Sequence, residues 1–129
     1  MTVRVLVTGS RQLPEPDRMI VFNALLEAHL TITDVGETMI VVHGDATGVD
    51  TEAARVAREL RCEVEAHPAH WRMDGKRAGV MRSLRMVAAG ASLCLAFPRR
   101  LSVGTWHCIR AASSAEIPTR IYPLPEIPR

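Results

Sequence analysis

Two stretches of sequence decide the fold: Val-Leu-Val-Thr-Gly-Ser-Arg at 5–11 and Ile-Val-Val-His-Gly-Asp-Ala-Thr-Gly-Val-Asp at 40–50. Each is a short apolar run followed by a glycine-containing turn and a helix-like segment. A third such turn, Ser-Val-Gly-Thr at 102–105, follows the apolar run 93–97. In an open parallel sheet, turns from strand to helix lie at the carboxyl edge, where ligands bind. The three turns therefore predict one pocket at that edge.

Strand-like and helix-like segments alternate along the chain. We expect strands at 3–8, 39–43, 62–67, 92–97 and 119–122, and helices at 17–30, 49–60, 77–89 and 105–115. We expect a loop at 68–76, anchored by Trp71. This alternation predicts an α/β fold, a Rossmann-like three-layer sandwich with a mostly parallel five-stranded sheet of order 3-2-1-4-5. That order places the first and fourth strands side by side, so that the turns after both face a ligand.

The composition limits the class of protein. A chain of 129 residues with 47% hydrophobic content is expected to form one domain, placed at 1–122, ahead of an extended proline-rich tail at 123–129. The formal charge of +2 and the 4% aromatic content argue against nucleic acid as a partner. No apolar stretch approaches the roughly 20 residues of a membrane span. With no signal peptide expected, and three cysteines outside any motif, we predict a cytoplasmic protein with reduced thiols.

The turns supply the predicted ligand-binding residues. Their glycines would let the backbone approach a ligand, although tight turns alone would also require them. Arg11 follows Gly-Ser at a strand end, where it could form a bidentate contact with phosphate. Lys76 and Arg82 belong to a basic run at the start of a helix, either a solvated face or a second phosphate contact. The full predicted set is Gly9, Ser10, Arg11, His43, Gly44, Gly48, Asp50, Lys76, Arg82, Ser102, Gly104 and Thr105.

Several interpretations stay open for individual side chains. Asp50 could cap the following helix, accept hydrogen bonds from ribose hydroxyls, or hold a neighbouring loop, and it is a weak catalytic candidate. For His43 we favour a structural role over proton transfer. Arg99 and Arg100 could bind a ligand or lie in an exposed loop. His67, His70 and Cys62 lack a second ligand pair at zinc-site spacing, so we expect no metal site and no cofactor.

Four motifs occur in the order found in the SLOG superfamily. They are Thr-Gly-Ser-Arg at 8–11, His-Gly-x-Ala-x-Gly-x-Asp at 43–50, Trp71 with Gly-Lys-x-Ala-Gly-x-x-Arg at 75–82 and Met86, and Ser-x-Gly-Thr at 102–105. Within this superfamily the chain most resembles the YspA-like (cpYpsA-related) branch, and the resemblance extends to about residue 122. More distantly it resembles the LOG-type phosphoribohydrolases and DNA-processing protein A. The resemblance implies a Rossmann-like fold that binds nucleotides or nucleotide-derived ligands.

The chain departs from the LOG pattern Pro-Gly-Gly-x-Gly-Thr-x-x-Glu, in which the glutamate is catalytic. Arg99 and Arg100 replace the first two glycines, and Cys108 stands at the glutamate position. Ser83 stands where close relatives often have Asn. The resemblance therefore favours a bacterial or phage protein that binds or senses a nucleotide-derived small molecule. The alternative is a nucleotide-processing hydrolase that cleaves an N-glycosidic or phosphate bond. We also expect a homodimer, paired through the helix at 77–89.

Overall fold

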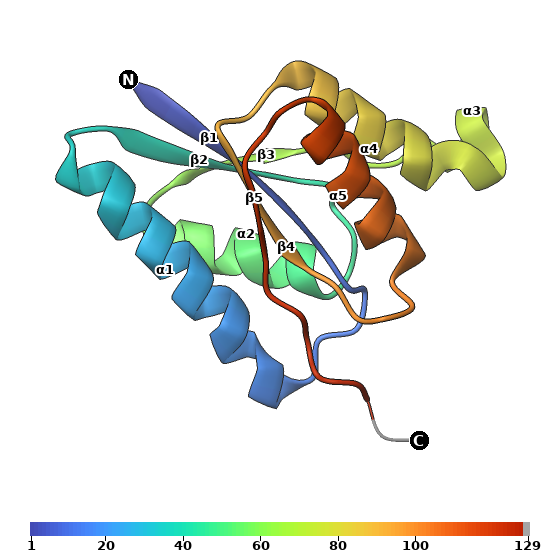
Figure 1. Ribbon diagram of the computed structural model, residues 1–129, viewed down its shortest axis with the longest axis horizontal. Coiled ribbons are helices and arrows are strands. Elements are labelled where there is room, and N and C mark those ends of the chain that lie inside the picture. Colours follow the sequence, from blue (N-terminus) through green and yellow to red (C-terminus); the bar gives the residue numbers. More distant parts are fainter. Residues whose placement is uncertain (128–129) are drawn as a thin grey trace.

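Five parallel strands form one sheet in the order β3-β2-β1-β4-β5 (Figure 1). The computed structural model describes residues 1–127. The strands are β1 (Thr2–Gly9), β2 (Thr38–His43), β3 (Glu63–Ala66), β4 (Leu93–Phe97) and β5 (Thr119–Ile121). The predicted α/β fold and strand order are confirmed, and all strand pairs are parallel. β1 and β4 are neighbours, with Gly9 in register with Phe97, so their carboxyl ends lie at the same point of the edge.

Helices cover both faces of the sheet. They are α1 (Arg18–Asp34), α2 (Val49–Glu59), α4 (Ala78–Ala89) and α5 (Val103–Ser114). Side chains alternate between the faces of a strand, so Val5 and Val7 pack with α1 and α2, whereas Leu6 packs with α4 and α5. Figure 1 shows these two helix layers on either side of the sheet. No helix within residues 1–127 is long and apolar enough to cross a bilayer.

The segment expected to be a loop at 68–76 contains short helical turns. These are the helix α3 (Trp71–Asp74) and the 3-10 turn η2 (Gly75–Arg77), and a further 3-10 turn, η1 (Glu15–Asp17), precedes α1. The loop prediction is wrong here because a single helical turn needs too few residues to show an apolar period. Trp71 remains 54% exposed, and the Arg11 guanidinium lies 5.8 Å from the centre of its ring. Trp71 therefore contacts the turn after β1 rather than the core.

The chain after β5 continues beside β4. The Tyr122 N–H donates to the Ala96 carbonyl and the Leu124 N–H to the Pro98 carbonyl, both at 2.8 Å. The Tyr122 and Phe97 rings stack with their centres 5.2 Å apart, and Leu124 is buried. Of the tail predicted at 123–129, the last two residues lie outside the described part of the chain. The rest packs onto the domain and reaches the carboxyl edge of the sheet.

Candidate ligand-binding site

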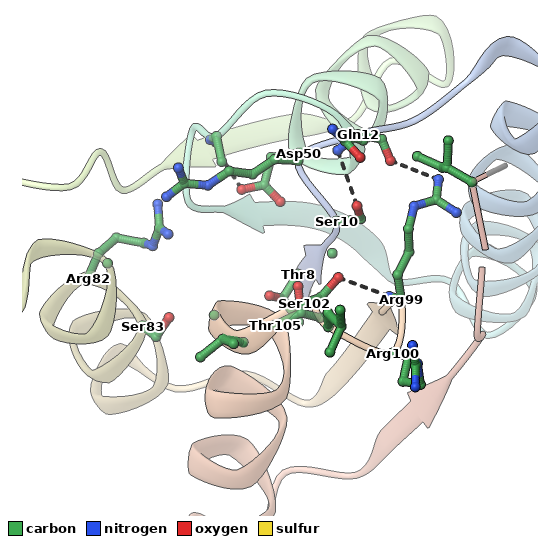
Figure 2. Close-up of a pocket in the computed structure, with 18 of the residues that line it drawn as sticks. Thr8, Ser10, Gln12, Asp50, Arg82, Ser83, Arg99, Arg100, Ser102 and Thr105 are labelled. Carbon is green, nitrogen blue, oxygen red and sulfur yellow. Dashed lines mark hydrogen bonds between the residues drawn. The ribbon is translucent and has the colours of Figure 1, made fainter. Parts of the chain in front are cut away.

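A cleft of about 670 Å³ lies at the carboxyl ends of β1 and β4. Figure 2 shows Asp50 on one side, Ser102 and Thr105 on the opposite side, and Arg82 at one end. All three glycine-containing turns contribute to it, together with α4 and the C-terminal segment. The predicted residues that line the cleft are Gly9, Ser10, Arg11, Asp50, Arg82, Ser102, Gly104 and Thr105. Segments far apart in the sequence, from Thr8 to Ile127, therefore meet in one cavity, as the topology predicts.

Gly48 and Gly44 shape the cleft without lining it. Gly48 has a φ of +80°, and a Cβ there would lie 2.4 Å from the Ser10 carbonyl oxygen. The Val49 N–H also donates to that oxygen at 3.0 Å, so the turns after β1 and β2 touch through their backbones. A Cβ on Gly44 would lie 2.7 Å from the Arg82 side chain, whose Nη1 donates to the Gly44 carbonyl at 2.6 Å. Both glycines permit close contact within the protein.

His43 and Lys76, also predicted as ligand-binding, lie outside the cleft lining. His43 is buried, and its Nδ1 accepts a hydrogen bond from the Asp45 N–H at 2.9 Å. Burial lowers the pKa of His43, which keeps the imidazole neutral and consistent with the structural role. Lys76 is exposed in η2, two residues before α4 begins. Although Lys76 lies close to the start of a helix, its side chain does not line the cleft at the carboxyl ends of β1 and β4.

Asp50 holds the turn after β2. Its Oδ2 accepts hydrogen bonds from the Gly44 N–H at 3.1 Å and from the Ala46 N–H at 3.2 Å. The loop-holding interpretation is therefore the one that the structure supports, and Gly48 rather than Asp50 precedes the helix as its cap residue. Oδ1 is buried and has no hydrogen-bond partner among residues 1–127. Burial raises the pKa of Asp50 to about 6, although the two N–H groups and Arg82 favour its charged form.

The start of α5 is open to the cleft. Ser102 precedes α5, but its hydroxyl accepts a hydrogen bond from the Arg99 N–H at 3.0 Å and does not cap the helix. The first N–H groups of a helix have no partner within it, and they carry the positive end of its dipole. A Cβ on Gly104 would have no neighbour within 4 Å, so the fold does not require glycine at this position. This arrangement is suited to an anion.

Arg99 and Arg100, adjacent in the sequence, have opposite environments. The Arg99 side chain is 7% exposed, and its guanidinium donates to the Gln12 carbonyl at 2.9 Å, to Asp17 at 3.2 Å and to the Pro125 carbonyl. It therefore ties the turn after β1 to the C-terminal segment. Arg100 is exposed and lines the cleft. Its backbone N–H donates to Oε1 of Glu126 at 3.1 Å.

The cleft also contains residues outside the predicted ligand-binding set. They are Thr8, Gln12, Ala46, Gly79, Ser83, Met86, Leu101, Val103, Glu126 and Ile127. Arg99 and Arg100, considered above as possible ligand contacts, also line the cleft. Thr8 belongs to the Thr-Gly-Ser-Arg motif at 8–11 and Gln12 follows it, so both could have been included in the predicted set. Glu126 and Ile127 follow the last strand and belong to no motif, so no local signal places them at the site. Only the course of the tail beside β4 brings them there.

Cys108, at the position of the LOG glutamate, does not line the cleft. Its side chain is fully buried, and burial raises the pKa of its thiol. A thiol that is neutral and inaccessible is a poor nucleophile. Neither a catalytic carboxylate nor a reactive thiolate therefore stands at this position.

Comparison with known proteins identifies a family and one similar phage protein. The family model for the "YspA, cpYpsA-related SLOG family" matches residues 3–73, which include β1, β2 and the turns after both. The chain is 48% identical over 120 residues to the Gene 61 protein of Mycobacterium phage D29, an alignment that covers 89% of this chain and 92% of the phage protein. No solved structure matches the chain.

Proposed function

The chain belongs to the YspA, cpYpsA-related SLOG family, and on that premise we propose that its cleft binds a nucleotide or a nucleotide-derived small molecule without turning it over. The cleft, rather than the family, limits what that ligand can be. Its volume of about 670 Å³ lies within the roughly 300–1,000 Å³ that is usual for small-molecule sites.

The main support for this proposal is that the same cleft holds a helix start without a side-chain cap and a buried carboxylate with an unpaired oxygen. The N–H groups at the start of α5 favour an anion such as phosphate. Oδ1 of Asp50 accepts a hydrogen bond, so it favours a hydroxyl or an amine. A nucleotide carries both kinds of group on one small molecule.

Homodimer formation through α4 stays a prediction. The exposed side chain of Leu84 is an apolar group that could take part in that contact.

Arg11 supplies the first test of this proposal. Arg11 is exposed at the cleft and contacts Trp71. We expect Arg11→Ala to weaken binding of a nucleoside monophosphate by roughly 1.5–3 kcal/mol, because a hydrogen bond to a charged partner is lost. The stability of the protein should change little, since an exposed cation–π contact contributes only about 0.5–1 kcal/mol. Calorimetric titration of both proteins measures the difference.

Lys76→Ala is the matched control, because Lys76 is a cation outside the cleft lining. Its removal should leave the affinity unchanged. Equal losses from both substitutions would indicate long-range electrostatic attraction, and an unchanged affinity in Arg11→Ala would exclude its contact with phosphate.

The second candidate function is hydrolysis, favoured by one specific observation. Asp50 is a cleft carboxylate whose pKa is raised to about 6, and general acid–base catalysis works best with a pKa close to the operating pH. Two observations argue against hydrolysis. Oδ2 of Asp50 already accepts hydrogen bonds from two backbone N–H groups, and the fully buried Cys108 stands at the position of the LOG glutamate. These contacts favour binding over turnover.

We therefore expect no release of base when the protein is incubated with AMP, a cytokinin-type riboside monophosphate or NAD. Cleavage of the base–ribose bond needs a carboxylate close to the ribose and help for the leaving base. Chromatography of the incubated mixtures follows the free base. Sustained release that Asp50→Asn abolishes would replace the binding proposal with a hydrolase in which Asp50 is catalytic.

A further inference from the structure

We propose that the cleft selects ligands that present a neutral N–H or O–H hydrogen-bond donor to Oδ1 of Asp50. This inference rests on the proposed binding of a nucleotide-derived ligand and adds a chemical requirement to it.

The Asp50 carboxylate is held in one orientation. Two backbone N–H groups, of Gly44 and Ala46, donate to Oδ2 at 3.1 and 3.2 Å. The same residue lines the cleft and is 5% exposed. A carboxylate that is fixed by one oxygen presents its other oxygen in a defined direction, which is what selective recognition requires.

Oδ1 lacks a donor from the protein. Across the part of the chain that the structure describes, no N–H or O–H group reaches it. The nearby cation Arg82 instead donates to the Gly44 carbonyl at 2.6 Å. Buried polar atoms are almost always paired, and leaving one unpaired is costly. Asp50 lines the cavity, so a ligand bound there can supply the missing donor.

The charges around Asp50 favour a neutral donor over a cationic one. Arg82 of α4 lies close enough to favour the charged form of Asp50, while Asp45 of the same turn opposes it. A ligand ammonium group beside Asp50 would meet the positive charge of Arg82 in a partly buried site, where charges interact strongly. On a nucleotide, the neutral donors are the ribose hydroxyls and the exocyclic amine of the base. Both offer the same chemistry to Oδ1.

Ligand analogues distinguish the two sources of the donor. The probes are AMP, 2′,3′-dideoxy-AMP, which lacks the ribose hydroxyls, and purine riboside 5′-monophosphate, which lacks the exocyclic amine. In calorimetric titrations of the full chain well above pH 6, we expect one of the two analogues to bind at least about tenfold more weakly than AMP. The weaker analogue identifies the group that faces Asp50.

Asp50→Asn reverses the polarity at the same position. Its carbonyl oxygen can accept the hydrogen bonds of Gly44 and Ala46, which directs the amide NH₂, a donor, toward the cleft. We expect AMP to bind this variant at least about tenfold more weakly, with AMP and the weaker analogue now bound equally. Asp45→Asn is the matched control, because Asp45 lies in the same turn, exposed and outside the cleft lining. Well above pH 6, where Asp50 is ionised in both proteins, this variant should bind AMP as the wild type does.

The pH profile separates ligand contact from a structural role. The ionisable groups that face Asp50 are Arg82, Asp45 and the buried Cys108 thiol of α5. A donor from the ligand stabilises the carboxylate, so the wild-type affinity should fall relative to that of Asp50→Asn as the pH drops below about 6. Because the phosphate of AMP titrates near pH 6 with both proteins, the ratio of the two affinities is the quantity to measure.

The outcomes are distinguishable. Equal affinities of the wild type for AMP and both analogues would overturn this inference and leave the proposed function standing. So would an Asp50→Asn variant that binds AMP as tightly as the wild type. If Asp50→Asn does not fold, the affinities of the wild-type protein for AMP and the two analogues still test the inference. Absence of binding by AMP, CMP, GMP and UMP would overturn the proposed function and this inference together.

Discussion

Replacing Gly48 with alanine is expected to lower the free energy of unfolding by about 3 kcal/mol or more. Gly48 has φ +80° and ψ −120°, a conformation that side-chain-bearing residues rarely adopt. The added Cβ would also lie 2.4–2.5 Å from backbone atoms of Ser10 and Arg11, which no change of rotamer can relieve. The turns after β1 and β2 would have to separate, with loss of the Val49 N–H to Ser10 hydrogen bond. Guanidinium-induced unfolding measures the change.

Gly104→Ala is the control for this prediction. Gly104 lies in the first turn of α5, and an added Cβ would have no neighbour within 4 Å. Alanine is the better helix former, so stability should stay unchanged or rise by up to about 1 kcal/mol. A Gly48→Ala protein as stable as Gly104→Ala would mean that the two turns do not touch as described.

Arg99→Met is expected to lower the free energy of unfolding by roughly 2–4 kcal/mol. Methionine fills much of the space but leaves Asp17 and the carbonyls of Gln12 and Pro125 without their shared donor. The C-terminal segment should then detach more readily from β4. Hydrogen exchange at the Leu124 N–H, which donates to the Pro98 carbonyl, should be faster in this variant.

The substitution of the neighbouring residue, Arg100→Met, tests whether the loss of stability in Arg99→Met depends on the buried contacts of that side chain. Arg100 is exposed, and it contacts Glu126 through its backbone N–H, which the substitution retains. Its stability should stay within about 0.5 kcal/mol of the wild type. Equal destabilisation by the two substitutions would show that Arg99 does not hold the tail in place.

The fold was predictable from local patterns because apolar runs and glycine turns are properties of neighbouring residues. The parallel order 3-2-1-4-5 is one of the few orders that short right-handed connections allow. For the same reason, the meeting of the turns at 9–11 and 102–105 was predictable, because β1 and β4 are adjacent. The single helical turn of α3 was not predictable, since four residues carry no period.

The sheet, the helices that cover it and the edge at which the cleft lies can be derived from the sequence, because periodicity and turn chemistry act within about ten residues. The polar side chains that face the cleft are selected by the tertiary structure. It buried Arg99 and exposed Arg100, brought Glu126 beside the turn after β4, and left one oxygen of Asp50 unpaired. The physical reason is that burial and hydrogen-bond pairing depend on every element packed around a side chain. Those neighbours are distant in the sequence, so no local pattern records them.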